Sequence, residues 1–273
     1  MANCDNGNNI GCADENKTGI EKLAQNDFSR IKNVIAVMSG KGGVGKSSVT
    51  SLLASEFNKK GYAVGVLDAD ITGPSLPKMF GVKGNLVVED NDSAILPLSS
   101  AKGIKVMSLN LMTPREDDPV IWRGPIIAGL VKQFWTEVAW GDLDYLFVDL
   151  PPGTGDVPLT VMQSLPLNGL IVVSSPQDLA VMIVSKAIKM ARIMNIPILG
   201  LVENMSGVVC PHCGEEFPLF GPSRGKEMSE SFQIPFIGRL PVDPQLSELC
   251  DQGKIEDYDT GLFNNFITER SFQ

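Results

Sequence analysis

A glycine-rich stretch places the strongest constraint on how this chain can fold. Residues 40–47 read Gly-Lys-Gly-Gly-Val-Gly-Lys-Ser and fit the pattern G-x-x-x-x-G-K-[ST]. They follow the apolar run 34–38 and precede a stretch with helical spacing, which is the position that a phosphate-binding loop occupies. Glycines let the backbone curl so that successive N–H groups point at a phosphate, and the following helix adds its positive N-terminal end. A plain glycine turn that opens a helix is the alternative.

The stretch therefore predicts a nucleotide site, with ATP and Mg²⁺ as the ligands. Lys46 should reach the β- and γ-phosphates, and the Ser47 hydroxyl should ligate Mg²⁺, which bridges the same oxygens. The nucleotide-binding residues expected here are Gly40, Lys41, Gly42, Gly43, Val44, Gly45, Lys46, Ser47 and Ser48.

Short apolar runs recur along the chain, each followed by a turn and a helical pattern. Continuous apolar runs indicate strands covered on both faces, and helices between them imply right-handed crossovers. The sequence therefore predicts an α/β fold, a doubly wound, mostly parallel sheet with helices on both faces. The runs are residues 34–38, 63–67, 145–148, 170–173, 198–202 and 236–237.

One segment departs from this rhythm. Within residues 85–110, short apolar pairs flank the polar run 89–93, which predicts a hairpin inserted at one edge of the sheet. A helix is expected over residues 125–139, with Trp135 and Trp140 in the core.

Length and charge limit the domain organisation and the partners. With 273 residues, of which 43% are apolar, the chain can form one large α/β domain. Residues 1–28 are rich in Asn, Asp and Gly and predict a mobile tail leading into a short helix, so residues 29–273 are the expected single domain. A net charge of −9 would repel nucleic acid, which is not expected as a partner.

No targeting or membrane segment is expected. The first thirty residues lack the apolar core of a signal peptide, and no later stretch approaches the roughly 18 unbroken apolar residues of a spanning helix. The sequence predicts a cytoplasmic protein without stable membrane association.

Carboxylates at strand ends are the second part of the predicted catalytic site. Asp149 closes the apolar run 145–148 and is the candidate that holds Mg²⁺ through water. The residues that follow it, 150–156, predict a stiff loop with glycine hinges that senses the γ-phosphate. Asp68 and Asp70 follow the run 63–67. Asp70 is placed to orient the attacking water, and for either residue capping of the next helix is the alternative.

Lys41 adds a second cation beside the glycines. Because Lys46 already serves the phosphates of its own chain, we expect Lys41 to cross a dimer interface to the partner's nucleotide, as an arginine finger does. A solvated loop lysine is the alternative. The predicted catalytic residues are thus Lys41, Lys46, Asp70 and Asp149.

A pair of cysteines predicts a metal site. Cys210 and Cys213 form the C-x-x-C of Cys-Pro-His-Cys-Gly, a spacing that lets both thiolates reach one soft metal centre. A [4Fe–4S] cluster or a closed tetrahedral site takes four ligands, so a twofold homodimer that presents the pair from each chain is the economical solution. Zinc is an alternative, since the motif resembles half a zinc ribbon, and a redox or inert pair is another.

The remaining cysteines give weaker indications. Cys250 follows Leu246 and Leu249 in an expected helix and is interpreted as a buried structural residue. His212, the only histidine, is expected to be a loop bystander. Cys4 and Cys12 have no assigned role.

Three motifs together resemble one known family. They are residues 41–47, Asp68-Ala-Asp-Ile-Thr-Gly-Pro-Ser (68–75) and Asp149-Leu-Pro-Pro-Gly-Thr-Gly-Asp (149–156). Over about residues 30–255 the chain resembles the Mrp/Nbp-type (ApbC-like) branch of the deviant Walker A superfamily, which includes ParA, MinD and the nitrogenase iron protein. The resemblance implies a slow, Mg²⁺-dependent ATPase that carries a [4Fe–4S] cluster between two subunits and transfers it to recipient apo iron–sulfur proteins.

The same resemblance implies further site residues and leaves rivals open. By similarity Asn204 should hydrogen-bond the adenine, with Pro241, Val242 and Asp243 around the base. A positioning ATPase like MinD or ParA is an alternative, although residues 261–270 carry only one cation and would gain little from anionic lipid. Nucleotide-dependent reduction, as in the nitrogenase iron protein, is a third possibility.

Overall fold

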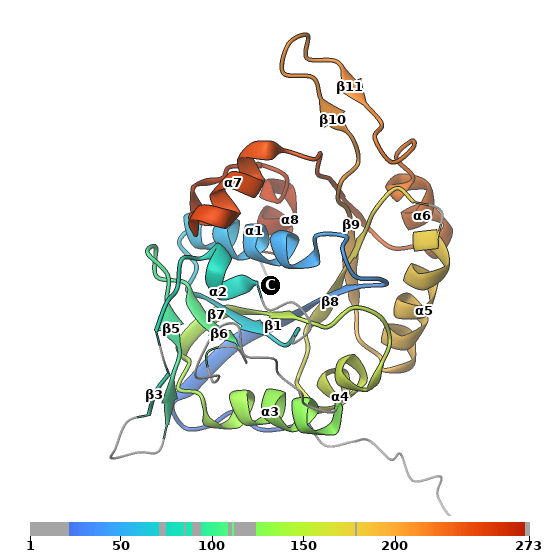
Figure 1. Cartoon of the computed structure of the whole chain (residues 1–273). Coiled ribbons are helices and arrows are strands. Elements are labelled where there is room, and N and C mark those ends of the chain that lie inside the picture. The colour runs from blue at the N-terminus through green and yellow to red at the C-terminus, as the bar shows by residue number, and fades with distance from the viewer. Residues whose placement is uncertain are drawn as a thin grey trace, which may run out of the picture.

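The structure is a computed structural model that describes residues 22–70, 75–84, 86–88, 94–108, 111, 124–177 and 179–270. Its centre is an eight-stranded sheet with the order β12-β9-β8-β1-β7-β2-β6-β5 (Figure 1). Neighbouring strands are parallel, except that β5 is antiparallel to β6. The strands are β1 (Ser29–Ser39), β2 (Val64–Asp68), β5 (Leu98–Ser99), β6 (Lys105–Ser108), β7 (Gly141–Asp149), β8 (Gly169–Ser174), β9 (Ile198–Glu203) and β12 (Phe236–Arg239).

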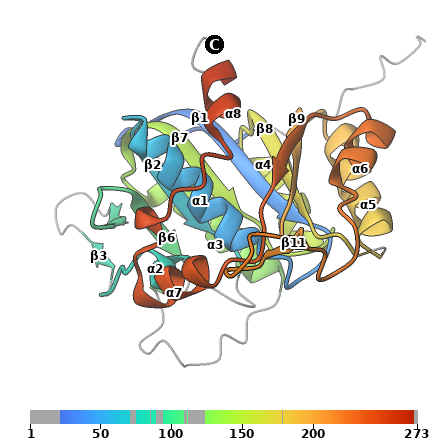
Figure 2. The same cartoon turned by 90° about the horizontal axis from the view of Figure 1, so that it is seen from above.

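Helices cover both faces of this sheet. In Figure 1, α1, α7 and α8 lie above it and α3 and α4 below it. From above, α1 lies over the strands, with α5 and α6 on one side of the molecule and β3 on the other (Figure 2). The helices are α1 (Lys46–Lys59), α2 (Leu76–Met79), α3 (Gly124–Glu137), α4 (Asp156–Ser164), α5 (Leu179–Ile193), α6 (Gly225–Phe232), α7 (Pro244–Gln252) and α8 (Asn264–Arg270).

Alternation along β1 explains the continuous apolar run. Val34, Ala36 and Met38 face one hydrophobic core with α3, α4 and α5. Ile35 and Val37 face the other core with α1 and α8. Successive side chains of a strand point to opposite faces, so a strand covered on both sides must be apolar at every position. The predicted fold class, a doubly wound and mostly parallel sheet, is confirmed.

The predicted edge hairpin is correct for only part of its segment. β3 (Val87–Val88) pairs antiparallel with β4 (Ile95–Leu96) in a separate two-stranded sheet. The polar run 89–93 lies outside the described residues. Further along, β5 and β6 form an antiparallel pair at one edge of the main sheet, as a hairpin inserted at an edge requires, and β6 is also parallel to β2. A short apolar run does not say which strand it pairs with, because pairing depends on distant residues.

The segment before β1 also differs from its prediction. Residues 22–28 form no helix. Instead, the backbone N–H of Leu23 donates to Ser164 O at 2.8 Å, and Trp135 Nε1 donates to Leu23 O at 3.0 Å. These bonds hold the segment in an extended path across α3 and α4, where a helix could not satisfy them. The earlier part of the expected tail, residues 1–21, lies outside the described residues.

Both tryptophans are core residues, as predicted. Trp135 and Trp140 are 0% exposed, and Trp140 Nε1 donates to Phe134 O at 3.1 Å. Within the described residues, no helix is long and apolar enough to cross a membrane.

Trp140→Ala should lower the free energy of unfolding by about 3–5 kcal/mol, because it leaves a large cavity where α3 meets β7. The measurement is urea denaturation followed by circular dichroism. Ile193→Ala is the control, since Ile193 is 74% exposed and its loss should change stability by less than about 0.5 kcal/mol. Equal stabilities of the two variants would contradict the packing described here.

Candidate functional site

The phosphate loop joins β1 to α1 at the end of the sheet where β1, β2 and β7 all finish. Gly45 precedes α1 with φ 75°, a left-handed conformation that favours glycine. A Cβ atom on Gly45 would also lie 2.2 Å from Asn204 Nδ2, so a larger residue would clash there. Both the conformation and the packing therefore require glycine at this position.

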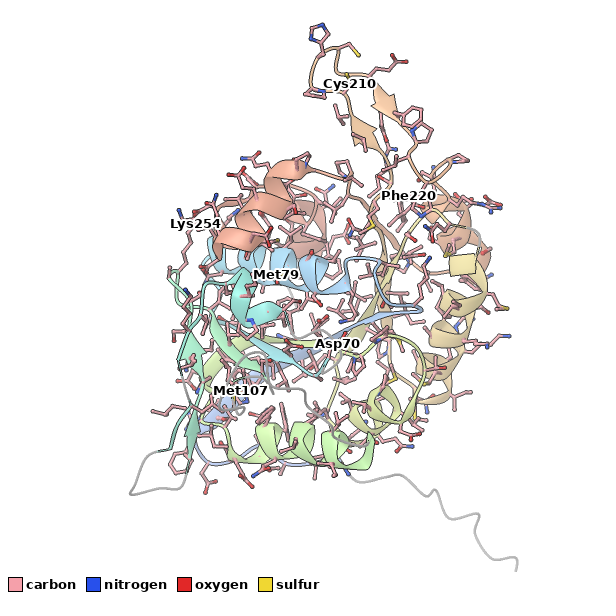
Figure 3. All side chains as sticks on the ribbon, viewed as in Figure 1. Asp70, Met79, Met107, Cys210, Phe220 and Lys254 are labelled. Atoms are coloured by element: carbon pink, nitrogen blue, oxygen red, sulfur yellow. The ribbon has the colours of Figure 1, made fainter. Side chains whose placement is uncertain are left out.

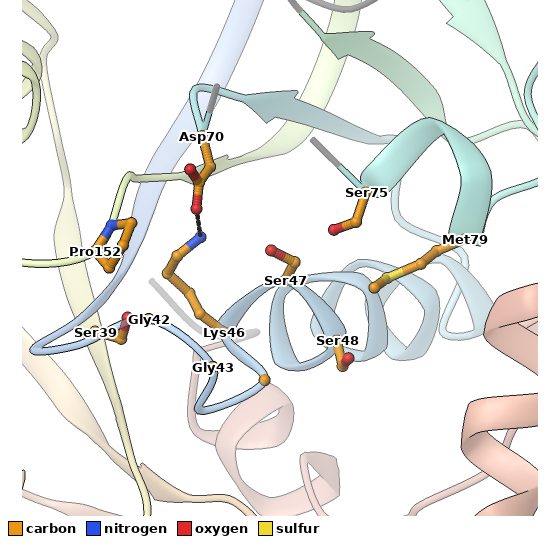
Figure 4. A pocket seen from close by; sticks show the side chains of 11 residues that line it. Ser39, Gly42, Gly43, Lys46, Ser47, Ser48, Asp70, Ser75, Met79 and Pro152 are labelled. Atoms are coloured by element: carbon orange, nitrogen blue, oxygen red, sulfur yellow. Dashed lines mark ion pairs between the residues drawn. The ribbon is translucent and has the colours of Figure 1, made fainter. Parts of the chain in front are cut away.

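A cavity of about 330 Å³ opens over this loop (Figure 4). Most of the loop residues named from the motif meet Asp70 and Pro152 here, whereas Gly40, Lys41 and Val44 do not line the cavity. Three lining residues were not predicted: Ser39 at the end of β1, Ser75 directly before α2 and Met79 at its end. Its lining residues are Ser39, Gly42, Gly43, Gly45, Lys46, Ser47, Ser48, Asp70, Ser75, Met79 and Pro152.

Lys46 lies between two carboxylates at the floor of the cavity. Its Nζ is 2.7 Å from Asp149 Oδ2 and 3.4 Å from Asp70 Oδ2 (the Asp70 ion pair is drawn in Figure 4). Nζ is buried, and these contacts are ion pairs without hydrogen-bond geometry. The N–H groups of this buried ammonium lack well-aligned acceptors. They are therefore suited to donate hydrogen bonds to the oxygen atoms of a phosphate.

Asp149 is wholly buried and receives two hydroxyl groups from α1. Ser47 Oγ donates to its Oδ2 at 2.6 Å, and Thr50 Oγ1 donates to its Oδ1 at 2.7 Å. Thr50 was not predicted, although its place one helical turn from Lys46 could have indicated it. Ser47 and Asp149 thus supply adjacent hard oxygen atoms, the ligand type that Mg²⁺ prefers.

Asp68 is buried close to Lys46 and Asp149, and among the described residues it caps no helix. Its Oδ1 accepts the backbone N–H of Asp70 at 3.0 Å, and its Oδ2 accepts Ser108 Oγ at 3.2 Å. Burial, with the nearby Asp149 charge next in size, raises the pKa of Asp68 to about 8, and Lys46 opposes that rise. This rise favours the protonated carboxyl of Asp68, which reduces repulsion beside Asp149.

Lys41 is directed within its own chain in this structure. Its Nζ donates to Gln177 Oε1, in the segment that follows β8. The side chain lies at the rim of the phosphate loop, apart from the ion pairs of Lys46. Its predicted crossing to a partner's nucleotide stays a prediction.

Of the four residues expected around the adenine, Asn204, Val242 and Asp243 have hydrogen-bond partners within the chain, and Val242 N donates to Gly207 O at 2.7 Å. Asn204 Nδ2 donates to Val44 O at 2.9 Å. Asp243 caps α7, where it accepts the N–H of Gln245 at 2.8 Å and the hydroxyl of Tyr258 at 2.7 Å. Pro241 directly precedes that turn. Their contact with adenine also stays a prediction.

The cysteine pair lies apart from the cavity, at the tip of a projecting hairpin (Figures 1 and 3). β10 (Val208–Val209) pairs antiparallel with β11 (Glu216–Phe217). At the tip, Gly214 N donates to Cys210 O at 2.8 Å, and Cys210 N donates to Glu215 O at 2.9 Å. Residues 211–220 are all exposed.

Hydrogen bonds at the tip favour the thiolate of Cys210. The backbone N–H of Cys213, then that of His212, and then the Cys213 thiol lower the pKa of Cys210. Within the described residues no group of three or more His, Cys, Asp or Glu side chains could hold a metal ion. Cys210 and Cys213 therefore offer an incomplete ligand set, and Cys4 and Cys12 lie outside the described residues.

Cys250 lies in α7 and is half-buried against the core around α1. Burial, followed by the charge of Asp251, raises the pKa of Cys250. The prediction of a structural cysteine agrees with this position.

The sheet order, the loop between β1 and α1 and the buried lysine–carboxylate group define a P-loop nucleotidase. A family profile described as ParA, NUBPL iron-transfer P-loop NTPase, matches residues 30–266. The chain belongs to this family of iron-transfer P-loop NTPases, which confirms the resemblance seen in its motifs.

Similar proteins agree with this assignment. An iron-sulfur cluster carrier protein of Clostridium perfringens is 48% identical over 243 residues, covering 87% of this chain and 85% of the relative. One from Methanocaldococcus jannaschii is 46% identical over 262 residues, covering 93% and 90%. A nucleotide-binding protein of Archaeoglobus fulgidus, solved in complex with ADP, is 47% identical with a TM-score of 0.77, covering 86% of this chain and 92% of that one.

The cell division ATPase MinD of Pyrococcus furiosus has a TM-score of 0.60 at 18% identity, covering 83% of this chain and 91% of that one. At this identity the likeness concerns the fold alone.

The alkylation rate of Cys210 should rise at a lower pH than that of Cys250. Because its pKa is lowered, Cys210 forms the reactive thiolate at a lower pH. Cys250, whose pKa is raised, forms its thiolate only at a higher pH. Iodoacetamide labelling over a pH series, resolved by peptide mass spectrometry, measures both rates in one molecule. Coinciding pH profiles would contradict the hydrogen bonding described at the hairpin tip.

Proposed function

We propose that this protein is an ATP-hydrolysing carrier that holds an iron–sulfur cluster between two copies of the chain and delivers it to apoproteins. One observation carries the proposal: a single chain combines a phosphate loop backed by buried carboxylates with an exposed cysteine pair whose first thiol has a lowered pKa. The names of the similar carrier proteins point to the same cargo.

The nucleotide part rests on the donor set around the cavity. Lys46 turns its ammonium from Asp149 and Asp70 toward the β- and γ-phosphates, where it gains well-aligned acceptors. Ser47 ligates Mg²⁺, and Asp149 holds the ion through water. When bound, Mg²⁺ supplies charge neutralisation at the β- and γ-oxygens. Binding of ADP by the similar Archaeoglobus protein supports a nucleotide in this cavity.

Hydrolysis needs an oriented water and added positive charge. Asp70 lies at the rim of the cavity beside Lys46, and it orients the attacking water. Lys41 leaves Gln177 and reaches the nucleotide of the partner chain. There it adds a positive charge, because the Lys46 of its own chain serves only the nucleotide of its own chain. This places part of the catalytic site on a second copy.

The cluster part rests on ligand number and on exposed apolar surface. Two thiolates from each chain complete the four ligands of a [4Fe–4S] cluster. Four large apolar side chains are exposed along the hairpin and the segment that follows it, between Cys210 at the tip and Phe220 near the body of the molecule (Figure 3), and such exposure is costly unless a partner covers it. They are Val209 at 50%, Phe217 at 63%, Leu219 at 48% and Phe220 at 40%.

This surface favours a homodimer over a solitary hairpin. A twofold axis beside the tip would bring both cysteine pairs together and bury both apolar surfaces. A zinc ion would suit the same four thiolates, and metal analysis separates the two cargoes. We place the protein in the cytoplasm, where thiols stay reduced.

A positioning ATPase is the second candidate, because the fold is shared with MinD. That function would leave the cysteine pair without a purpose. The carrier function uses both sites.

Lys46→Ala should remove ATP hydrolysis, because the β- and γ-phosphates lose their buried cation, and Asp149→Asn should weaken the Mg²⁺ dependence. Lys41→Ala should still bind ATP but hydrolyse it far more slowly. Phosphate release by each purified variant is the measurement, with Lys189→Ala, an exposed lysine on α5, as the control. Mg²⁺-dependent turnover in Lys46→Ala at the wild-type rate would refute the assignment.

Replacing Cys210 and Cys213 together by Ala should abolish iron and sulfide binding and spare ATP binding. The test is the absorption spectrum and the iron, sulfide and zinc content of protein prepared without oxygen. Cys250→Ala is the matched control and should keep its metal. Wild-type iron and sulfide in the double variant would place the cluster elsewhere, and zinc in place of iron in the wild type would favour the zinc-bridged dimer.

A further inference from the structure

Four residues connect β9 to the cysteine hairpin, and we name residues 204–207 the connector. They follow Glu203, the last residue of β9, and lead directly into Val208, the first residue of β10. Asn204 is 6% exposed and Ser206 is 3% exposed, although polar residues in connecting loops usually face water. Buried polar groups need fixed partners, and the partners of the connector lie in the phosphate loop, at the end of β8 and in residues 240–242.

At its first end the connector is bonded to the phosphate loop. Asn204 Nδ2 donates to Val44 O at 2.9 Å, and Asn204 N donates to Ser174 O at the end of β8 at 2.8 Å. The amide packs so closely on the loop that a Cβ on Gly45 would lie 2.2 Å from Nδ2. A change in the loop backbone at Val44 therefore acts directly on Asn204.

At its other end the connector is bonded to residues 240–242, which follow β12 and which also form a bridge to Val208 at the start of the hairpin. Ser206 donates to Leu240 O through both N, at 2.9 Å, and Oγ, at 3.1 Å. Gly207 O accepts Val242 N at 2.7 Å. A Cβ on Gly207 would lie 3.1 Å from Phe217 O in β11, so the connector backbone abuts the returning strand.

The middle of the connector is a fixed bend. Met205 has φ 58°, a left-handed conformation that is uncommon for residues other than glycine. Such conformations persist only where the surrounding contacts determine them. Cys210 lies three residues beyond the connector, so a short and tightly packed path joins the phosphate loop to the cysteine pair.

We propose that the connector transmits the nucleotide state to the cysteine pair, with Asn204 as the positioning residue that links the phosphate loop to the hairpin. The inference rests on the proposed function, because it needs a nucleotide at the loop and a metal cargo at Cys210 and Cys213. A nucleotide that moves the Val44 carbonyl strengthens or breaks the Asn204 bond and so reorients the hairpin. By linkage, cargo at the cysteines changes nucleotide affinity by the same factor.

The test measures alkylation of Cys210 and Cys213 by iodoacetamide in reduced, metal-free, full-length protein. Rates are compared without nucleotide, with saturating ADP and with a saturating non-hydrolysable ATP analogue, and Cys250 is the internal reference. In the wild type we expect the Cys210 rate to differ by about fivefold between the two nucleotides, at the lower end of usual coupling strengths. Asn204→Ala also removes the predicted adenine contact, so each nucleotide is raised in concentration until equilibrium dialysis shows full occupancy, and the two rates should then become equal.

Gly207→Ala provides a second variant that leaves the phosphate loop intact. Its added methyl group presses on β11 and should reduce the nucleotide dependence without changing ADP affinity. Asn33→Ala is the matched control. Asn33 Nδ2 also donates to a backbone carbonyl, Asp144 O at 3.1 Å, but far from the loop, so wild-type dependence should remain.

Two results would overturn the inference: equal rates in the wild type with nucleotide bound, or wild-type dependence in both Asn204→Ala and Gly207→Ala. Neither would affect the carrier function, which is judged separately by ATP turnover and iron content. If the wild-type protein failed to bind ATP, or failed to bind iron, both the carrier function and this inference would be wrong.

Discussion

The Asp149 carboxylate is the point on which the geometry of the nucleotide site depends. It is wholly buried at the end of β7 and accepts hydroxyl groups from Ser47 and Thr50 while pairing with Lys46. An isolated carboxylate in such a place would be costly, so these three groups of α1 must meet the sheet in one register. The requirement fixes the start of α1, and with it the loop whose residues line the cavity.

The same burial sets the charge balance of the site. Asp68, Asp70 and Asp149 all lie near one ammonium group, that of Lys46. Retaining a proton on Asp68 removes one negative charge from a region of low dielectric constant. The remaining surplus of carboxylate oxygens suits the proposed Mg²⁺. A polyphosphate then needs further cations, and the proposed role of Lys41 at a partner's nucleotide would supply one.

The sequence predicts those parts of the fold that are determined locally. Residues 34–38 and 170–173 are buried on both faces and are therefore recognisable as strands. The first residues of β1 alternate between buried and exposed, with Arg30 and Lys32 outward, so the strand begins earlier than its apolar run. The phosphate loop is recognisable for a similar reason, because its glycines and lysine lie within eight consecutive residues.

Contacts between distant residues account for what the sequence does not predict. Thr50 meets Asp149, and Asn204 meets Val44, across 99 and 160 residues of chain. Ser75 and Met79 reach the cavity only because α2 packs beside α1. The sequence does not reveal that Phe217 is exposed either. An apolar residue in a strand pattern is normally expected to pack against its own chain.

The hairpin explains why a carrier of this kind would need both a nucleotide and a second copy. Each of its strands is two residues long, and a two-stranded hairpin is marginally stable by itself. Its base is held by the pairing of Arg239 with Glu216, at 2.6 and 2.8 Å, and by the connector, whereas the tip, residues 211–214, is exposed in the part of the chain that the structure describes. The orientation of the tip is therefore open to two influences, a partner's apolar surface and the phosphate loop.

Hydrolysis can bias that orientation by no more than the difference in ATP affinity between the two arrangements, so tight nucleotide binding alone would move no cluster. The phosphate loop is bonded to Asn204, and the chain continues from Asn204 through three residues into β10, which is the path by which we propose that the arrangement of one site affects the affinity of the other.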